Sequence, residues 1–306
     1  MLLGKVTTNV KTGVPLDTQT TDTGDYAFPL LQTGEYQVTV ENAGFRQEAR
    51  KGILLQVNEK VRVDFTLQVG SQAEVVTVNA ETANLRTDEA SIGGTVEQRR
   101  LVELPMNGRN VGNFAVLNPG VSFGQRHGTD GQSGTGGGIP IPGQTIAIIA
   151  NGQREVSQHA TLDGVVATES RVNTVPFSPS PEAMEEVRVI TGSYSAEYGF
   201  NSGAQLVMIM RSGTNELHGS LYDFLRNDKL DAEGFFQNYF TPAGQPRVRK
   251  TSLRQNQFGG VVGGPVISGL YDGRNRTFFN FNMRADAVGT GCNFNSPRSY
   301  RCVSQW

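Results

Sequence analysis

Hydrophobic and polar residues alternate along several short stretches of the chain, as they do in strands that bury one face. Over the first seventy residues the alternation is clearest at 36–40 and 61–67, and glycine-containing turns lie at 22–25 and 32–35. We therefore predict a small antiparallel β-sandwich over residues 1–70. Its pattern begins abruptly at Val6, so we expect its first strand to be missing.

A mixed pattern follows over residues 71–211, where short helices alternate with strands. Thr95 and Gln98 have the spacing of a capping box, which predicts a helix through Leu101 that ends before Pro105. Further short helices are predicted over 110–117 and from Ser180, before strands over 186–191 and 204–210. The glycine-rich stretch 124–143 cannot bury enough apolar area to offset its ordering entropy, and we interpret it as a mobile loop within an α+β domain.

Strand-length runs return over residues 217–225, 256–267 and 277–285. The last run places one set of side chains on one face (Thr277, Phe279, Phe281, Met283) and another on the opposite face (Phe278, Asn280, Asn282, Arg284). The connection 226–250 is long and the connection 269–275 is short, an asymmetry typical of outer-membrane barrels. We predict the start of an antiparallel transmembrane β-barrel over 212–290 and an irregular tail over 291–306, so the fold class is β-rich and multidomain.

Charge and hydropathy exclude two classes of protein. The 27 Lys and Arg residues are balanced by 29 Asp and Glu, which argues against a nucleic-acid partner. No stretch of about 18 apolar residues occurs, and the mean hydropathy of −0.33 agrees, so a helical membrane protein is excluded. The start of the chain has no secretory signal peptide, which leaves either a cytosolic protein or a missing N-terminus.

The sequence contains no zincin helix, dithiol motif or P-loop. Three histidines lie far apart, and paired acids such as Glu185 and Glu186 are best interpreted as solvated charge. We therefore expect no enzyme, no cofactor and no metal. Cys292 and Cys302 could close a small disulfide loop outside the cytosol or be incidental, so their role stays open.

Motifs in the sequence resemble those of two protein families. Residues 23–28, 31–40 and 43–45 resemble a carboxypeptidase-regulatory-like, or Cna-B-like, β-sandwich. A longer succession resembles the plug and first barrel strand of Oar-like TonB-dependent outer-membrane receptors, and its motifs lie at residues 102–110, 117–121, 162–165, 185–189, 194–199 and 212–220. This resemblance covers roughly residues 6–285.

The resemblance implies a plug domain over 71–211 that occludes a large barrel, uptake of a substrate that the sequence leaves unknown, and TonB as the partner at the periplasmic face. It also implies the outer membrane of a Gram-negative bacterium as the location, provided that the chain is exported. Ninety-four residues (306 − 212) follow Ser212, too few for twenty or more strands of about ten residues each. We expect a fragment that is not competent for transport alone, although a partner could complete it.

One segment is similar to a TonB box, the short extended stretch that couples such receptors to TonB. This coupling segment, as we call it, lies between the sandwich and the plug and consists of Glu74, Val75, Val76, Thr77, Val78, Asn79 and Ala80. An extended β-branched segment suits strand addition to another protein's sheet. The same composition suits the first strand of the plug, and the sequence leaves both assignments open.

Two functions of different class are compatible with these observations. The first is the plug-bearing N-terminal part of a TonB-dependent receptor, and the second is a secreted Cna-B-like binding or adhesion module. An adhesin would not need the motifs at 194–220 or the aromatic run at 278–281, which suit a barrel wall. We therefore favour the receptor.

Overall fold

The computed structural model describes residues 4–57, 59–70, 75–79, 91–104, 106–124, 145–170, 173–198, 201–230, 232, 253–268 and 271–290. These residues belong to two compact units, one formed by 1–216 with 264–279 and the other by 217–263 with 280–306. Several expectations lie outside the described residues: the mobile loop, apart from Gly124, most of the connection 226–250, and the tail with both cysteines.

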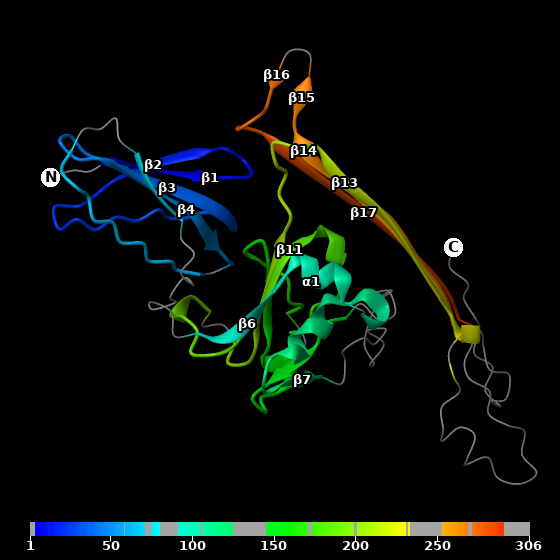
Figure 1. Ribbon diagram of the computed structural model, residues 1–306. Coiled ribbons are helices and arrows are strands. Elements are labelled where there is room, and N and C mark those ends of the chain that lie inside the picture. Colours follow the sequence, from blue (N-terminus) through cyan, green and yellow to red (C-terminus); the bar gives the residue numbers. More distant parts are fainter. Residues whose placement is uncertain are drawn as a thin grey trace, which may run out of the picture. The chain divides into compact units, whose positions relative to one another are not determined.

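The N-terminal part of the first unit contains a five-stranded sheet, drawn in blue to cyan in Figure 1. Its order is β2-β1-β3-β4-β5, with bounds β1 (Gly4–Asn9), β2 (Pro15–Gln19), β3 (Gly34–Glu41), β4 (Gln47–Leu55) and β5 (Val75–Asn79). Neighbouring strands are antiparallel, except that β5 runs parallel to β4. The turns predicted near Gly24 and Gly34 are present, and both glycines have a positive φ.

The second layer over this sheet corrects one sequence prediction. Residues 61–67 alternate between half-buried and exposed as expected, but they form no hydrogen-bonded strand. Val61, Val63 and Phe65 instead pack on a cluster that contains Tyr36 and Ile53. The segment covers one face of the sheet and does not extend its edge. The alternating pattern therefore predicted correctly which side chains are buried, and the prediction that the backbone forms a strand was wrong.

A second five-stranded sheet has the order β10-β9-β12-β11-β6. Its strands are β6 (Ile92–Glu97), β9 (His159–Leu162), β10 (Val165–Val166), β11 (Met184–Gly192) and β12 (Gln205–Met210), and only the β12–β9 pair among them is parallel. A hairpin of β7 (Val121–Phe123) and β8 (Ile148–Ala150) accompanies it, together with α1 (Gln98–Glu103), η1 (Asn107–Arg109), η2 (Val111–Leu117), η3 (Glu155–Ser157), η4 (Pro181–Ala183) and η5 (Ala196–Tyr198).

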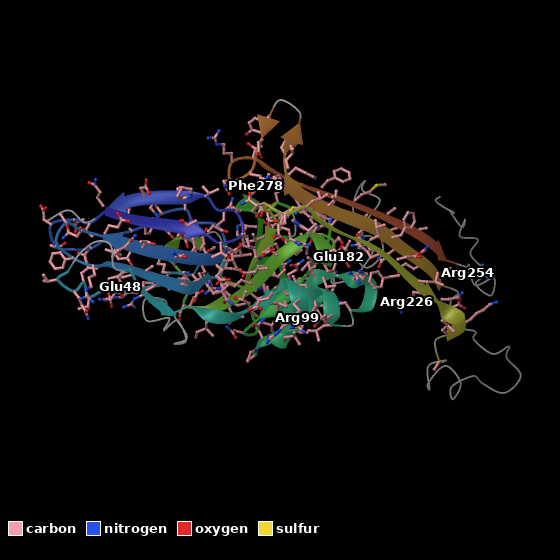
Figure 2. All side chains as sticks on the ribbon, turned by 45° about the horizontal axis from the view of Figure 1, so that its top comes forward. Glu48, Arg99, Glu182, Arg226, Arg254 and Phe278 are labelled. Atoms are coloured by element: carbon pink, nitrogen blue, oxygen red, sulfur yellow. The ribbon has the colours of Figure 1, made fainter. Side chains whose placement is uncertain are left out.

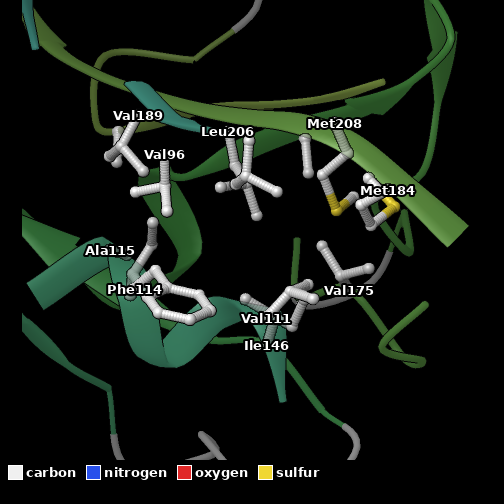
Figure 3. Close-up of a cluster of buried hydrophobic side chains, with 14 of the residues drawn as sticks. Val96, Val111, Phe114, Ala115, Ile146, Val175, Met184, Val189, Leu206 and Met208 are labelled. Carbon is white, nitrogen blue, oxygen red and sulfur yellow. The ribbon is translucent and has the colours of Figure 1, made fainter. Parts of the chain in front are cut away.

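The largest buried cluster lies between this sheet and the short helices (Figure 3). Val187, Val189 and Leu206 enter it from β11 and β12, and Val111 and Phe114 enter it from η2. Because β11 and β12 are inner strands of the sheet, their apolar side chains form the centre of this core.

Helix α1 ends before Pro105 as predicted, but the predicted capping box is wrong. Thr95 lies in β6, opposite Arg188 of β11, and the N-cap residue is Glu97, which makes no side-chain capping bond. Pairing in the sheet therefore outweighs the local capping preference. The short helix predicted over 110–117 is present as η2, where the Asn110 side chain accepts the Gly112 N–H.

Three long strands run side by side in the order β13-β14-β17 (Figure 1). They are β13 (His218–Asn227), β14 (Leu253–Pro265) and β17 (Phe278–Thr290), and the remaining elements are η6 (Asp228–Leu230), β15 (Ile267–Ser268) and β16 (Tyr271–Asp272). All three predicted strand runs are confirmed. Most of this sheet lies in the second unit.

Large apolar side chains are exposed on one face of this sheet, which also carries Asp223 and Asn256. On the face shared by β13 and β14, Leu221 is 91% exposed, Leu225 is 72% exposed and Phe258 is 46% exposed. On the opposite face of β14, Gln255 and Gln257 are buried. Figure 2 labels Arg226 and Arg254 near one end of the sheet, which agrees with the pairing of Arg226 with Gln255. An apolar outer face with a polar inner face is the arrangement of a membrane barrel wall.

The fold class predicted from the sequence is confirmed as β-rich, with mainly antiparallel sheets and a barrel sheet that is not closed within the described residues. Among these residues, no helix is both long enough and apolar enough to span a membrane.

We expect Leu206→Ala to lower the free energy of unfolding by about 2–5 kcal/mol, because it leaves a cavity in the largest core cluster. Leu117 is 63% exposed, so the matched control Leu117→Ala should cost less than about 0.5 kcal/mol. Urea unfolding of the chain in mild detergent, followed by far-ultraviolet circular dichroism, measures both. Equal losses would contradict this placement of the core.

Candidate functional site

The coupling segment is described from Val75 to Asn79 as strand β5, and its end residues Glu74 and Ala80 lie outside the described residues. It pairs in parallel with β4, from Gln47 opposite Val75 to Lys51 opposite Asn79. β5 is the last strand of that sheet, so within the described part of the chain its second edge carries no strand. The segment is therefore extended and belongs to the sheet of the sandwich, whereas the second sheet begins with β6.

Strand β4 leads directly to a loop residue that is held by β11. Val57 follows the end of β4 by two positions and is 3% exposed. Its side chain packs with Ile190 and Val207, and partly buried neighbours include Tyr194 and Tyr198. An apolar anchor from the first sheet thus inserts into an apolar cluster on the second.

The backbone of Val57 is bonded on both sides by charged side chains of β11. Its N–H donates to Glu186 Oε2 at 2.8 Å, and its carbonyl accepts from Arg188 Nη1 at 2.7 Å. Arg188 also donates to the Ser91 hydroxyl at 2.8 Å. Glu186 and Arg188 are 7% and 5% exposed, so these bonds are shielded from water. We call Val57, Glu186 and Arg188 the Val57 anchor.

Burial raises the pKa of the Glu186 carboxyl above its ordinary value of 4.5. The Val57 N–H opposes this shift, whereas the nearby carboxylates of Glu185, Glu97 and Glu59 add to it. From the sequence alone, the charges of Glu185 and Glu186 are both predicted to be solvated. For Glu186 that interpretation is wrong, because the loop that covers it comes from residue 57, which is 129 positions away in the sequence.

The motif at residues 107–110 forms a buried polar network. Gly108 and Arg109 both have positive φ, of 70° and 53°, which turn the chain sharply after α1. Arg109 pairs with Glu182, and the Ser180 hydroxyl bonds the same carboxylate at 2.5 Å. Asn110 donates to the Thr145 carbonyl at 3.0 Å. This network fixes the loop before η2 against η4, so the motif has a structural role in this domain.

A second motif, at residues 162–165, forms the tight turn between β9 and β10. Asp163 and Gly164 have φ of 49° and 80°, the left-handed conformations that a two-residue hairpin turn requires. Asp163 Oδ1 also accepts the Met210 N–H at 2.9 Å, which ties the turn to the end of β12.

Among the described residues, His159 is a histidine with a shifted pKa. Burial lowers the pKa of His159, whose Nδ1 lies 3.3 Å from the Thr168 hydroxyl. Within the part of the chain that the structure describes, no three His, Cys, Asp or Glu side chains gather closely enough to hold a metal ion. His127 and both cysteines lie outside that part.

Comparison with known protein families gives two matches. The model of a carboxypeptidase regulatory-like domain matches residues 5–68, and the model of an outer membrane beta barrel domain matches residues 209–291. The first range covers β2, β3, β4 and all of β1 but its first residue, and it leaves β5 outside. The second range covers the β13-β14-β17 sheet.

Among curated proteins, the TonB-dependent transporter Oar of Myxococcus xanthus is 26% identical over 247 residues, which is 80% of this chain. The match covers 22% of that transporter, so this chain spans about a fifth of its length.

Among solved structures, the siderophore receptor PirA from Acinetobacter baumannii matches 65% of this chain and 24% of its own, with a TM-score of 0.41 and 18% identity. The ferric enterobactin receptor PfeA from Pseudomonas aeruginosa, a mutant form, matches the same shares with a TM-score of 0.40 and 14% identity.

We expect Arg109→Ala to destabilise the chain by about 3–5 kcal/mol, because it leaves the Glu182 carboxylate buried without its guanidinium partner. Arg99 and Glu103 form an ion pair on α1 with side chains that are 82% and 62% exposed, so Arg99→Ala should cost less than about 0.5 kcal/mol. Urea unfolding distinguishes the two variants, and similar values for both would contradict a structural role of the motif.

We expect the free energy of unfolding to decrease with rising pH relative to a Glu186→Gln variant. A carboxyl whose pKa is raised in the folded state contributes stability that is complete below 4.5 and is lost as the pH rises through the folded value. The glutamine side chain of the variant keeps an oxygen acceptor for the Val57 N–H but does not titrate. Unfolding at a series of pH values from 4 to 8 measures the difference, and a difference independent of pH would show that Glu186 is not desolvated.

Proposed function

We propose that this chain, which is similar to the TonB-dependent transporter Oar, acts as the plug-bearing N-terminal part of such an outer-membrane receptor. The observation that carries this proposal is the order of its parts: a carboxypeptidase regulatory-like domain, an extended coupling segment, an α+β domain and barrel strands. The domain limits that we propose are 1–70, 71–211, 212–290 and 291–306. The second limit lies between β12, which ends at Met210, and β13, which begins at His218, and the coupling segment lies just after the first limit.

This proposal implies a location and an activity for the chain. Its barrel strands lie in the outer membrane, and the sandwich and the coupling segment face the periplasm. It carries out uptake in company with the rest of a barrel and has no enzymatic activity. The exposed Leu221, Leu225 and Phe258 support contact with lipid, since large exposed apolar side chains are unfavourable in water; Asp223 lies between the two leucines on the same face. A secreted adhesion module would gain nothing from that face.

The coupling segment, from Glu74 to Ala80, is the site that we propose for TonB. β5 is already extended, and its free edge presents backbone N–H and C=O groups in the way that strand addition requires. The partner can pair with this edge while β5 keeps its pairing with β4. Affinity from backbone bonds depends little on the identity of the side chains, which fits the plain β-branched composition of the segment.

We expect a peptide of residues 72–82 to bind the periplasmic domain of TonB, and Thr77→Pro to weaken that binding about tenfold because it removes a backbone donor and blocks pairing. Val76→Ile keeps the extended conformation and should change the dissociation constant by less than about twofold. Isothermal titration calorimetry measures the three peptides, and the whole chain with and without Thr77→Pro provides the comparison in context. Absence of binding, or binding that is indifferent to proline, would contradict the assignment.

A further inference from the structure

The coupling segment is joined to the second sheet by the chain itself and by contacts of the first sheet. The Val57 anchor is the buried contact, and the contacts of Lys11 with Glu185 and of Gln56 with Glu97 are exposed. The covalent route leads from Asn79 to Ile92, the first residue of β6, through the twelve residues 80–91. A chain of that length can extend to about 40 Å before it becomes taut. The second route is not covalent: it passes from β5 to β4 through their parallel pairing, and from β4 to the Val57 anchor.

The second route is short and firmly held at each step. Five residue pairs join β5 to β4, and a force along the strands loads their bonds together and not one after another. One residue, Gln56, separates the end of β4 from Val57. At Val57 the side chain is buried, and both backbone groups are bonded by Glu186 and Arg188.

Strand β11, which receives this connection, is an inner strand of its own sheet, between β12 and β6. It pairs with β12 over residues 184–190 and with β6 over residues 186–192. Its alternate residues Val187 and Val189 lie in the largest core cluster. Displacement of β11 would therefore disturb the core of the whole α+β domain, whereas displacement of an outer strand would not.

We propose that the sandwich is a force-bearing adaptor, which carries tension on the coupling segment along β4 to the Val57 anchor and into β11. This inference rests on the proposed function, since β5 is loaded only if it is the segment that a partner pulls. The sandwich then does more than present the segment: it determines which strand of the plug receives the force. Glu186 and Arg188 are positioning residues in this scheme.

Single-molecule force spectroscopy tests the proposal on the full chain without TonB. Tension is applied between cysteine handles at positions 75 and 211, in a chain whose own two cysteines are replaced by serine. For the unmodified anchor we expect the linker to extend in a discrete step at a finite force. Arg188→Ala and Val57→Ala should roughly halve that release force, because each removes one contact of a buried set.

Two controls separate the anchor from general damage. Arg99→Ala on exposed α1 and Leu117→Ala on η2 remove nothing from the anchor and should leave the release force unchanged. Amide hydrogen exchange of the β11–β12 pair shows whether each variant retains the folded domain. A release force that is the same in all variants, or a linker that extends without any step, would overturn the proposal. Because the handles replace the partner, a failure of TonB binding has no effect on this result.

Discussion

Both faces of strand β11 are buried, one in the apolar core and the other around Val57. The arrangement of the first unit depends on this burial of both faces. Val187 and Val189 point into the apolar core, whereas Glu186, Arg188 and Ile190 belong to the opposite face and are buried as well. Charged groups are costly to bury unless every one is bonded. The backbone of Val57 supplies an N–H for the carboxylate and a carbonyl for the guanidinium, so the loop after β4 completes a face of the second sheet.

Buried polar groups have a comparable role in the short helices. The pairing of Arg109 with Glu182, together with the Ser180 and Asn110 side chains, fixes turns whose backbone has left-handed conformations. Such networks contribute specificity more than net stability, since their charges must first lose water. In the sheet of three long strands, by contrast, leucine and phenylalanine side chains are exposed and glutamine side chains are buried. This distribution is unfavourable for a sheet that is surrounded by water.

Much of this fold can be predicted from the sequence because strand alternation is a local property. The runs at 36–40, 186–191, 204–210 and 217–225 all lie in strands, and the helix before Pro105 ends where proline requires. The failures concern partners that are distant in the chain. Residues 61–67 have strand alternation without a strand, Thr95 pairs with β11 and does not cap a helix, and Glu186 is buried by a loop 129 positions away. Nothing in the local pattern around Val57 distinguishes it from an ordinary loop valine. The coupling segment remains a prediction from resemblance, although its extended form agrees with it.

Amide hydrogen exchange of Val57 in the folded chain measures how firmly β11 holds its backbone. We expect this loop amide to exchange as slowly as the amides of β11, because it opens only when the buried carboxylate loses its donor. Exchange at the rate of an exposed loop amide, while the amides of β11 stay protected, would contradict it.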